Sequence, residues 1–108
     1  MRVNGLSKTR NLTVRIDDKT YREIEETATQ DNVDRSTVAR TLLKIGIKET
    51  KKKRALEKYR TQEYTLWKAA QAAEIPLREM MTLIEEQKIT LHITPEDVDE
   101  AWREAFEE

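Results

Sequence analysis

The feature that most constrains this chain is one strict alternation of polar and apolar residues near its N-terminus. Residues 11–16 are NLTVRI, in which Leu12, Val14 and Ile16 are apolar and the intervening residues are polar. A period of two is typical of a strand that is buried on one face only. A strand must pair its backbone N–H and C=O groups, but no second run of this kind occurs before residue 88. Because an open strand edge favours pairing with another chain, the sequence predicts that two copies pair through this strand.

Two amphipathic helices are expected directly after the strand. Asp17 and Asp18 supply an N-cap and negative charge for the first helix, which is predicted to run to about Gln30. Asn32 stands where the chain must turn, and Asn tolerates the left-handed conformation that ends helices. Asp34 is predicted to cap the second helix. One small neighbour cannot cover the apolar face of this helix, which again favours two interlocked copies; the face consists of Val38, Ala39, Leu42, Leu43, Ile45 and Ile47.

Residues 9–49 resemble the ribbon-helix-helix DNA-binding proteins, which include small phage and bacterial repressors and the DNA-binding parts of many antitoxins. The resemblance rests on NLTVRI, DDKTYREIEETA and DNVDRSTVARTLLKIGI, in this order. It implies that the strands of two copies pair antiparallel in an intertwined homodimer, and that this ribbon enters the major groove of operator DNA. The outward-facing residues that it implies as base contacts are Asn11, Thr13 and Arg15.

The residue types at these three positions suit base recognition. Asn can pair with adenine, Arg with the O6/N7 edge of guanine, and Thr can contact the thymine methyl group. The opposite face of the ribbon is expected to join the second helix in a dimer core that consists of Leu12, Val14, Ile16, Val38, Leu42 and Ile45.

Phosphate contacts are expected at two places. The resemblance implies that the backbone N–H groups of Arg35 and Ser36, which open the second helix, bind a phosphate. The family often has Ser at the cap position where this chain has Asp34, so a phosphate there requires the carboxylate to turn back onto its own helix. Lys8 and Arg10 precede the ribbon and are expected to contact backbone phosphates as well.

The two halves of the chain carry opposite charge. Residues 1–60 hold 16 Lys or Arg against 9 Asp or Glu, whereas residues 61–108 hold 4 against 12. This split favours a basic half that binds a polyanion and an acidic half that binds another partner. The alternative is that the surface charge contributes only to solubility. The expected organisation is a DNA-binding and dimerisation domain at 1–50, a basic helical linker at 51–60 and an acidic helical protein-interaction domain at 61–108.

The acidic half is predicted to hold a helix-turn-helix-like pair, a short extended segment and a final helix. Thr65 is expected to cap the first helix, and Pro76 to open the second. KITLHI at 88–93 alternates, so it is either a short strand or an extended segment that a partner captures. Thr94 and Pro95 begin the final helix. Its apolar face is expected to pack on the helix pair, with a partner's surface as the alternative; the face consists of Val98, Ala101, Trp102, Ala105 and Phe106.

Residues 55–93 are also similar to a family of small prokaryotic antitoxin-like proteins. The similarity rests on Tyr59, Thr65, Leu66, Ala69, Ala70, Met80, Met81, Leu83 and Ile84. It implies an antitoxin that represses its own operon, bound to DNA as a homodimer or higher oligomer and to a toxin through its C-terminal half. Two alternatives stay open: a stand-alone transcriptional regulator whose C-terminal domain oligomerises or senses a ligand, and a plasmid partition or relaxosome accessory protein.

Composition argues against several other classes of protein. The chain has no Cys, which excludes a Cys-based metal site and a thiol nucleophile. Its single His, His92, is not accompanied by a recognisable Ser/His/Asp set. Only two Gly are present, so no Gly-rich phosphate loop exists. An enzyme is the weakest candidate, and no cofactor or metal is expected. No stretch has the length and apolarity of a signal peptide or a membrane span, so a cytoplasmic protein is expected.

Overall fold

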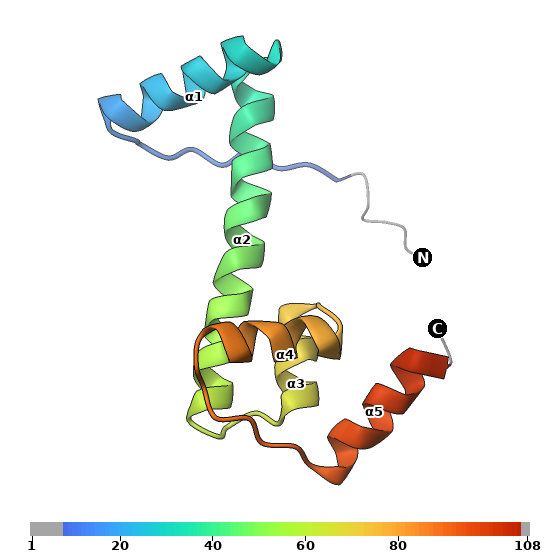
Figure 1. The fold of residues 1–108 in the computed structure, drawn as a ribbon. Helices are drawn as coiled ribbons and strands as arrows, with labels where there is room; N and C mark the ends of the chain where they lie inside the picture. Colours follow the sequence, from blue (N-terminus) through green and yellow to red (C-terminus); the bar gives the residue numbers. More distant parts are fainter. Residues whose placement is uncertain (1–7, 107–108) are drawn as a thin grey trace. The chain divides into compact units, whose positions relative to one another are not determined.

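The computed structural model describes residues 8–106, and all the regular secondary structure within them is helical. The helices, drawn in Figure 1, are α1 (Asp18–Asp31), α2 (Arg35–Arg60), α3 (Leu66–Ala73), α4 (Leu77–Glu86) and α5 (Pro95–Phe106). The chain divides after Arg40 into two compact units, and α2 contributes to both of them. The mainly helical class expected from the sequence is therefore confirmed.

The strand expected at residues 11–16 is not seen. Residues 8–17 have no regular secondary structure and are exposed along their whole length. A strand exists only where its backbone groups pair with a neighbouring strand, and residues 8–106 provide no such neighbour. The second alternating segment, at 88–93, likewise forms no strand, and its capture by a partner stays a prediction.

In the first unit, α1 begins and ends at the caps that the sequence predicted. The Asp17 carboxylate accepts the Thr20 N–H at 3.2 Å, and Asn32 ends α1 in the left-handed conformation with φ 57°. Among the described residues of this unit, only Ala28 and Val38 are buried apolar side chains. Two such residues make a very small core, and small domains of this kind usually need a partner to be stable.

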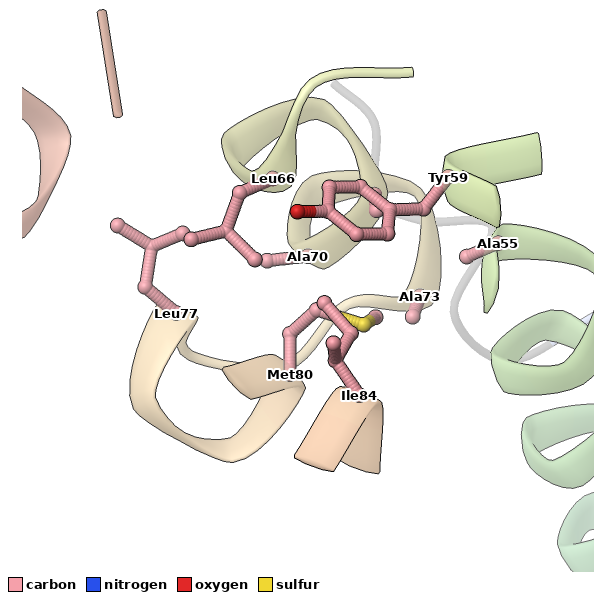
Figure 2. Packing of buried hydrophobic residues seen from close by; sticks show 9 residues of the cluster. Ala55, Tyr59, Leu66, Ala70, Ala73, Leu77, Met80 and Ile84 are labelled. Carbon is pink, nitrogen blue, oxygen red and sulfur yellow. The ribbon is translucent and has the colours of Figure 1, made fainter. Parts of the chain in front are cut away.

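The core of the second unit is formed where the C-terminal part of α2 meets α3 and α4. Figure 2 shows the side chains of this cluster pointing toward one another. The small side chains of α3 let its neighbours approach closely. The buried members are Ala55 and Tyr59 from α2, Leu66, Ala69, Ala70 and Ala73 from α3, and Leu77, Met80 and Ile84 from α4. The basic segment 51–60 is thus helical, and it also supplies part of this core.

Helix α5 contacts both α3 and α4, but not through the apolar face that was expected to pack there. Val98, Trp102 and Phe106 are 57%, 64% and 67% exposed, so the apolar face of this helix is not buried on the helix pair. Two carboxylates, Asp97 and Glu104, contact α3 and α4 instead. Hydrogen bonds to helix N-termini, which the apolar pattern does not reveal, decide which side of α5 faces inward.

Candidate functional site

The predicted base-contact residues Asn11, Thr13 and Arg15 lie on the exposed segment before α1. Their side chains are accessible, and they alternate along the chain with Leu12, Val14 and Ile16, which are exposed as well. Lys8 and Arg10, the predicted phosphate contacts, are also exposed. This segment therefore presents two kinds of side chain, and its apolar ones have no covering partner within the described chain.

Of the six residues predicted to form the dimer core, the structure buries only Val38. Leu42 and Ile45 follow Val38 by four and seven residues on α2, so the three side chains lie on one side of this helix. Leu42 and Ile45 are about half exposed, and the three strand residues are exposed too. The single chain does not bring the predicted core together, so the shared core stays a prediction.

The start of α2 is where a phosphate contact was predicted. The Asp34 carboxylate accepts the Thr37 N–H at 3.0 Å, so it is turned back onto its own helix. This hydrogen bond with Thr37 lowers the pKa of Asp34, which keeps the group ionised as a cap. Arg35 and Ser36 occupy the first turn of α2, where backbone N–H groups have no acceptor within the helix.

The side chain of Arg35 is engaged in the fold. Its guanidinium lies 5.4 Å from the centre of the Tyr21 ring and donates a hydrogen bond to the Tyr21 hydroxyl. It also forms an ion pair with Glu25 at 3.4 Å. These contacts join the start of α2 to α1 within the first unit.

The second unit contains two carboxylates whose role the sequence did not reveal. Asp97 is only 2% exposed and accepts the backbone N–H groups of Trp67 at 2.6 Å and Thr94 at 2.9 Å. Both oxygens of Glu104 lie 3.1 Å from the backbone N–H of Leu77. The N-termini of α3 and α4 thus receive negative charge from α5, which satisfies their N–H groups and suits their dipoles. The Thr94-x-x-Asp97 capping spacing was the only signal in the sequence.

Tyr59 fixes the extended segment between α4 and α5. Its hydroxyl donates to the His92 carbonyl oxygen at 3.0 Å and accepts the His92 N–H. Burial raises the pKa of Tyr59, and the negative charge of Asp97 adds to this effect. The imidazole of His92 is exposed, and the backbone of this residue, not its side chain, carries the contact.

Several Lys of the basic run 48–60 are paired with carboxylates of the second unit. Lys51 lies 2.9 Å from Glu74, and Lys52 lies 3.7 Å from Glu79. Lys58 lies 3.6 Å from Glu63. These pairs are partly exposed and contribute little stability, but they reduce the charge that this part of α2 offers to a polyanion.

The surface of the second unit also carries open grooves. An open groove of about 380 Å³ lies beside α4, lined by Arg78, Met81, Thr82, Ile84, Glu85, Ile89 and Leu91. Within residues 8–106 no three His, Asp or Glu side chains gather as metal ligands would. No helix in this part of the chain combines the length and apolarity needed to cross a bilayer.

Comparison with known proteins gives one match. The matching family model is described as an uncharacterised protein family, UPF0175, and it covers residues 9–107. No curated protein and no solved structure matches the chain significantly. The family match includes the exposed N-terminal segment, both units and the whole of α5, and on this basis the chain belongs to the uncharacterised family UPF0175.

Proposed function

We propose that this chain is a homodimeric, sequence-specific DNA-binding repressor whose N-terminal segments pair as a two-stranded ribbon in the major groove. One observation carries the proposal. Residues 11–16 alternate strictly, and Leu12, Val14 and Ile16 are exposed in the single chain. Antiparallel pairing with a second copy would satisfy the backbone of this segment and place all three apolar side chains on one face.

The exposed side of α2 supports the same assembly. Leu42 and Ile45 continue the side that begins with the buried Val38, and both are exposed. A second copy that covers the ribbon's apolar face would cover these side chains too, because a shared core enlarges what a small unit can bury. The opposite face of the ribbon would then present Asn11, Thr13 and Arg15 to base edges.

The contact with phosphate is supported by the start of α2. The Asp34 carboxylate accepts the Thr37 N–H, so it is turned toward its own helix and not toward an approaching anion. The N–H groups of Arg35 and Ser36 are of the kind that anchors a phosphate at a helix N-terminus. Two such anchors in a dimer would fix the ribbon's position relative to the groove.

The test is DNA binding measured by fluorescence anisotropy over a series of salt concentrations. The probe is the DNA upstream of the protein's own gene, compared with a scrambled duplex of the same composition. Arg15→Ala is expected to cost about 1–3 kcal/mol per site and to reduce the preference for the native duplex. Arg22→Ala is the matched control, since Arg22 is an exposed residue of α1 paired with Asp18. Equal losses of preference in both variants would refute base reading by the ribbon.

We propose further that the repressor acts as an antitoxin, with its acidic half binding a basic toxin. The support is the excess of 12 Asp or Glu over 4 Lys or Arg in residues 61–108, together with the similarity of residues 55–93 to antitoxin-like proteins. The test is co-expression with the product of an overlapping neighbouring gene. Growth arrest by that product alone, relieved by this chain, is the expected result; no arrest and no complex would leave the role of a plain regulator.

A further inference from the structure

Helix α5 presents an apolar stripe that residues 8–106 of its own chain leave uncovered. Val98, Trp102 and Phe106 follow one another at intervals of four residues, so they share one side of the helix. The rings of Trp102 and Phe106 lie 4.5 Å apart between centroids, which makes the stripe continuous. The other side of α5 is held by the hydrogen bonds of Asp97 and Glu104, so the helix cannot turn the stripe inward without breaking them.

Helix α2 carries a second exposed apolar stripe, which has basic residues beside it. Leu43 and Ile47 are 53% and 55% exposed and lie four residues apart. Since successive residues of a helix are rotated by about 100°, these two side chains do not share the side of Leu42 and Ile45. The proposed dimer core would therefore leave Leu43 and Ile47 exposed.

The charged residues beside the two stripes have charges of opposite sign. Arg40 precedes Leu43 by three residues and Arg54 follows Ile47 by seven, which places both cations on the same side of α2. On α5, Asp99 lies three residues before Trp102 and is exposed. The one base of α5, Arg103, is paired with Glu100. An acidic apolar stripe and a basic apolar stripe, both exposed, thus exist in the same polypeptide.

We infer that α5 of one copy packs on the Leu43–Ile47 side of α2 in a second copy, with Asp99 facing the cations of that side. This inference rests on the homodimer of the proposed function. In a dimer with two-fold symmetry the contact occurs twice, because each copy supplies one stripe of each kind. Dimerisation through the N-terminal unit raises the effective concentration of the two stripes, so a small contact area suffices.

The first test uses the absence of Cys in the chain. Leu43→Cys protein is mixed with Val98→Cys protein, and the mixture is treated with a short bismaleimide. A mixed cross-linked dimer is expected, because each thiol is contributed by a different copy. Glu85→Cys, on an exposed residue of α4, replaces Val98→Cys in the matched control and should give no such product. Equal yields from the two mixtures would overturn the inference.

The second test follows the burial of Trp102. Trp67→Phe leaves Trp102 as the sole tryptophan, and its accessibility is measured by acrylamide quenching at concentrations where the protein is dimeric. We expect Trp102 to be shielded, and the added change Leu43→Ser with Ile47→Ser to restore quenching without changing the dimer mass. Asp99→Lys should also restore quenching, and adding Arg54→Asp should shield Trp102 again.

The outcomes separate this inference from the proposed function. If the dimer forms and reads DNA while Trp102 stays accessible to acrylamide, only the α5 contact is refuted. If Trp102 is shielded but the Leu43→Ser and Ile47→Ser changes leave it so, α5 binds elsewhere and the inference also fails. A chain that is monomeric at all concentrations refutes both the dimer and the contact.

Discussion

The buried carboxylate of Asp97, near the start of α5, accepts the backbone N–H of Trp67, near the start of α3, at 2.6 Å. The second oxygen of the same carboxylate accepts the Thr94 N–H at 2.9 Å, while the Thr94 hydroxyl accepts the Asp97 N–H at 3.2 Å. One side chain thus closes the N-terminus of α5 and joins it to that of α3. The acidic side chains of the C-terminal half are for this reason not all available to a partner.

Replacing Asp97 is expected to loosen α5 from the second unit. Asp97→Ala leaves the Trp67 and Thr94 N–H groups without their acceptor in a buried place, which should lower the free energy of unfolding by about 1–3 kcal/mol. Asp97→Asn should cost less, because its amide oxygen can still accept one hydrogen bond. Urea denaturation followed by circular dichroism measures both. Glu96→Ala, at an exposed neighbour, should stay within about 0.5 kcal/mol of the wild type; a comparable loss there would argue against a specific role for Asp97.

Tyr59 is expected to make the stability of the second unit depend on alkaline pH. Burial raises its pKa above the ordinary value of 10.0. A group whose pKa is raised on folding stabilises the fold fully below its unfolded pKa, and this contribution is lost as the pH rises through the folded one. The urea midpoint of the wild type should therefore fall above pH 10, and Tyr59→Phe should show a smaller fall.

At pH 7, Tyr59→Phe also removes both hydrogen bonds to the His92 backbone, which should cost about 0.5–1.5 kcal/mol for each. The matched control is Tyr64→Phe, which changes a partly buried tyrosine at the edge of the same core. It should retain the alkaline fall of the wild type. An unchanged alkaline fall in Tyr59→Phe would contradict the assignment to this residue.

Local features of the fold were predictable because their causes lie within a few residues. The caps Asp17, Thr65 and Thr94 and the left-handed Asn32 were all expected, and the structure confirms each of them. In every case a side chain or a backbone conformation acts on its own helix end. Met80 and Met81 were both expected as core residues, but only Met80 is buried and Met81 is 38% exposed, because neighbouring residues of a helix point to different sides.

The orientation of α5 was not predictable from its apolar pattern. The residues that decide it, Asp97 and Glu104, contact backbone groups 30 and 27 positions away in the sequence. A pattern of hydrophobicity contains no information on such pairs, so the helix was expected to bury the wrong side. The ribbon is a different case, because its proposed pairing partner is another chain, and both the pairing and the roles of Asn11, Thr13 and Arg15 stay predictions.

The proposed dimer core predicts that Leu42→Glu gives a monomer. The change would place a charge within an apolar interface, which costs more than burying an unpaired neutral group. The dissociation constant should rise by more than about tenfold, which corresponds to about 1.4 kcal/mol. Sedimentation over a concentration series measures it, and DNA binding should be lost in parallel. Ile93→Glu is the control, since Ile93 is equally exposed but lies on the extended segment before α5; a similar shift there would locate the interface elsewhere.

The Asp34 carboxylate offers a way to test the phosphate contact without disturbing the helix. Asp34→Ser keeps an oxygen that can accept the Thr37 N–H, so α2 should remain capped. The change also removes a negative charge close to the N–H groups of Arg35 and Ser36. If a DNA phosphate binds there, affinity should rise severalfold at low salt, because the repulsion between the carboxylate and the phosphate is removed. Anisotropy titrations of both proteins, with native and scrambled duplexes, measure the change. The gain should be equal for the two duplexes, because a phosphate contact carries no sequence information.

The matched control is Asp31→Ser, at the last residue of α1, which removes a negative charge away from the N–H groups of Arg35 and Ser36. An equal gain in that control would show a general effect of net charge, and an unchanged affinity in Asp34→Ser would place the phosphate elsewhere.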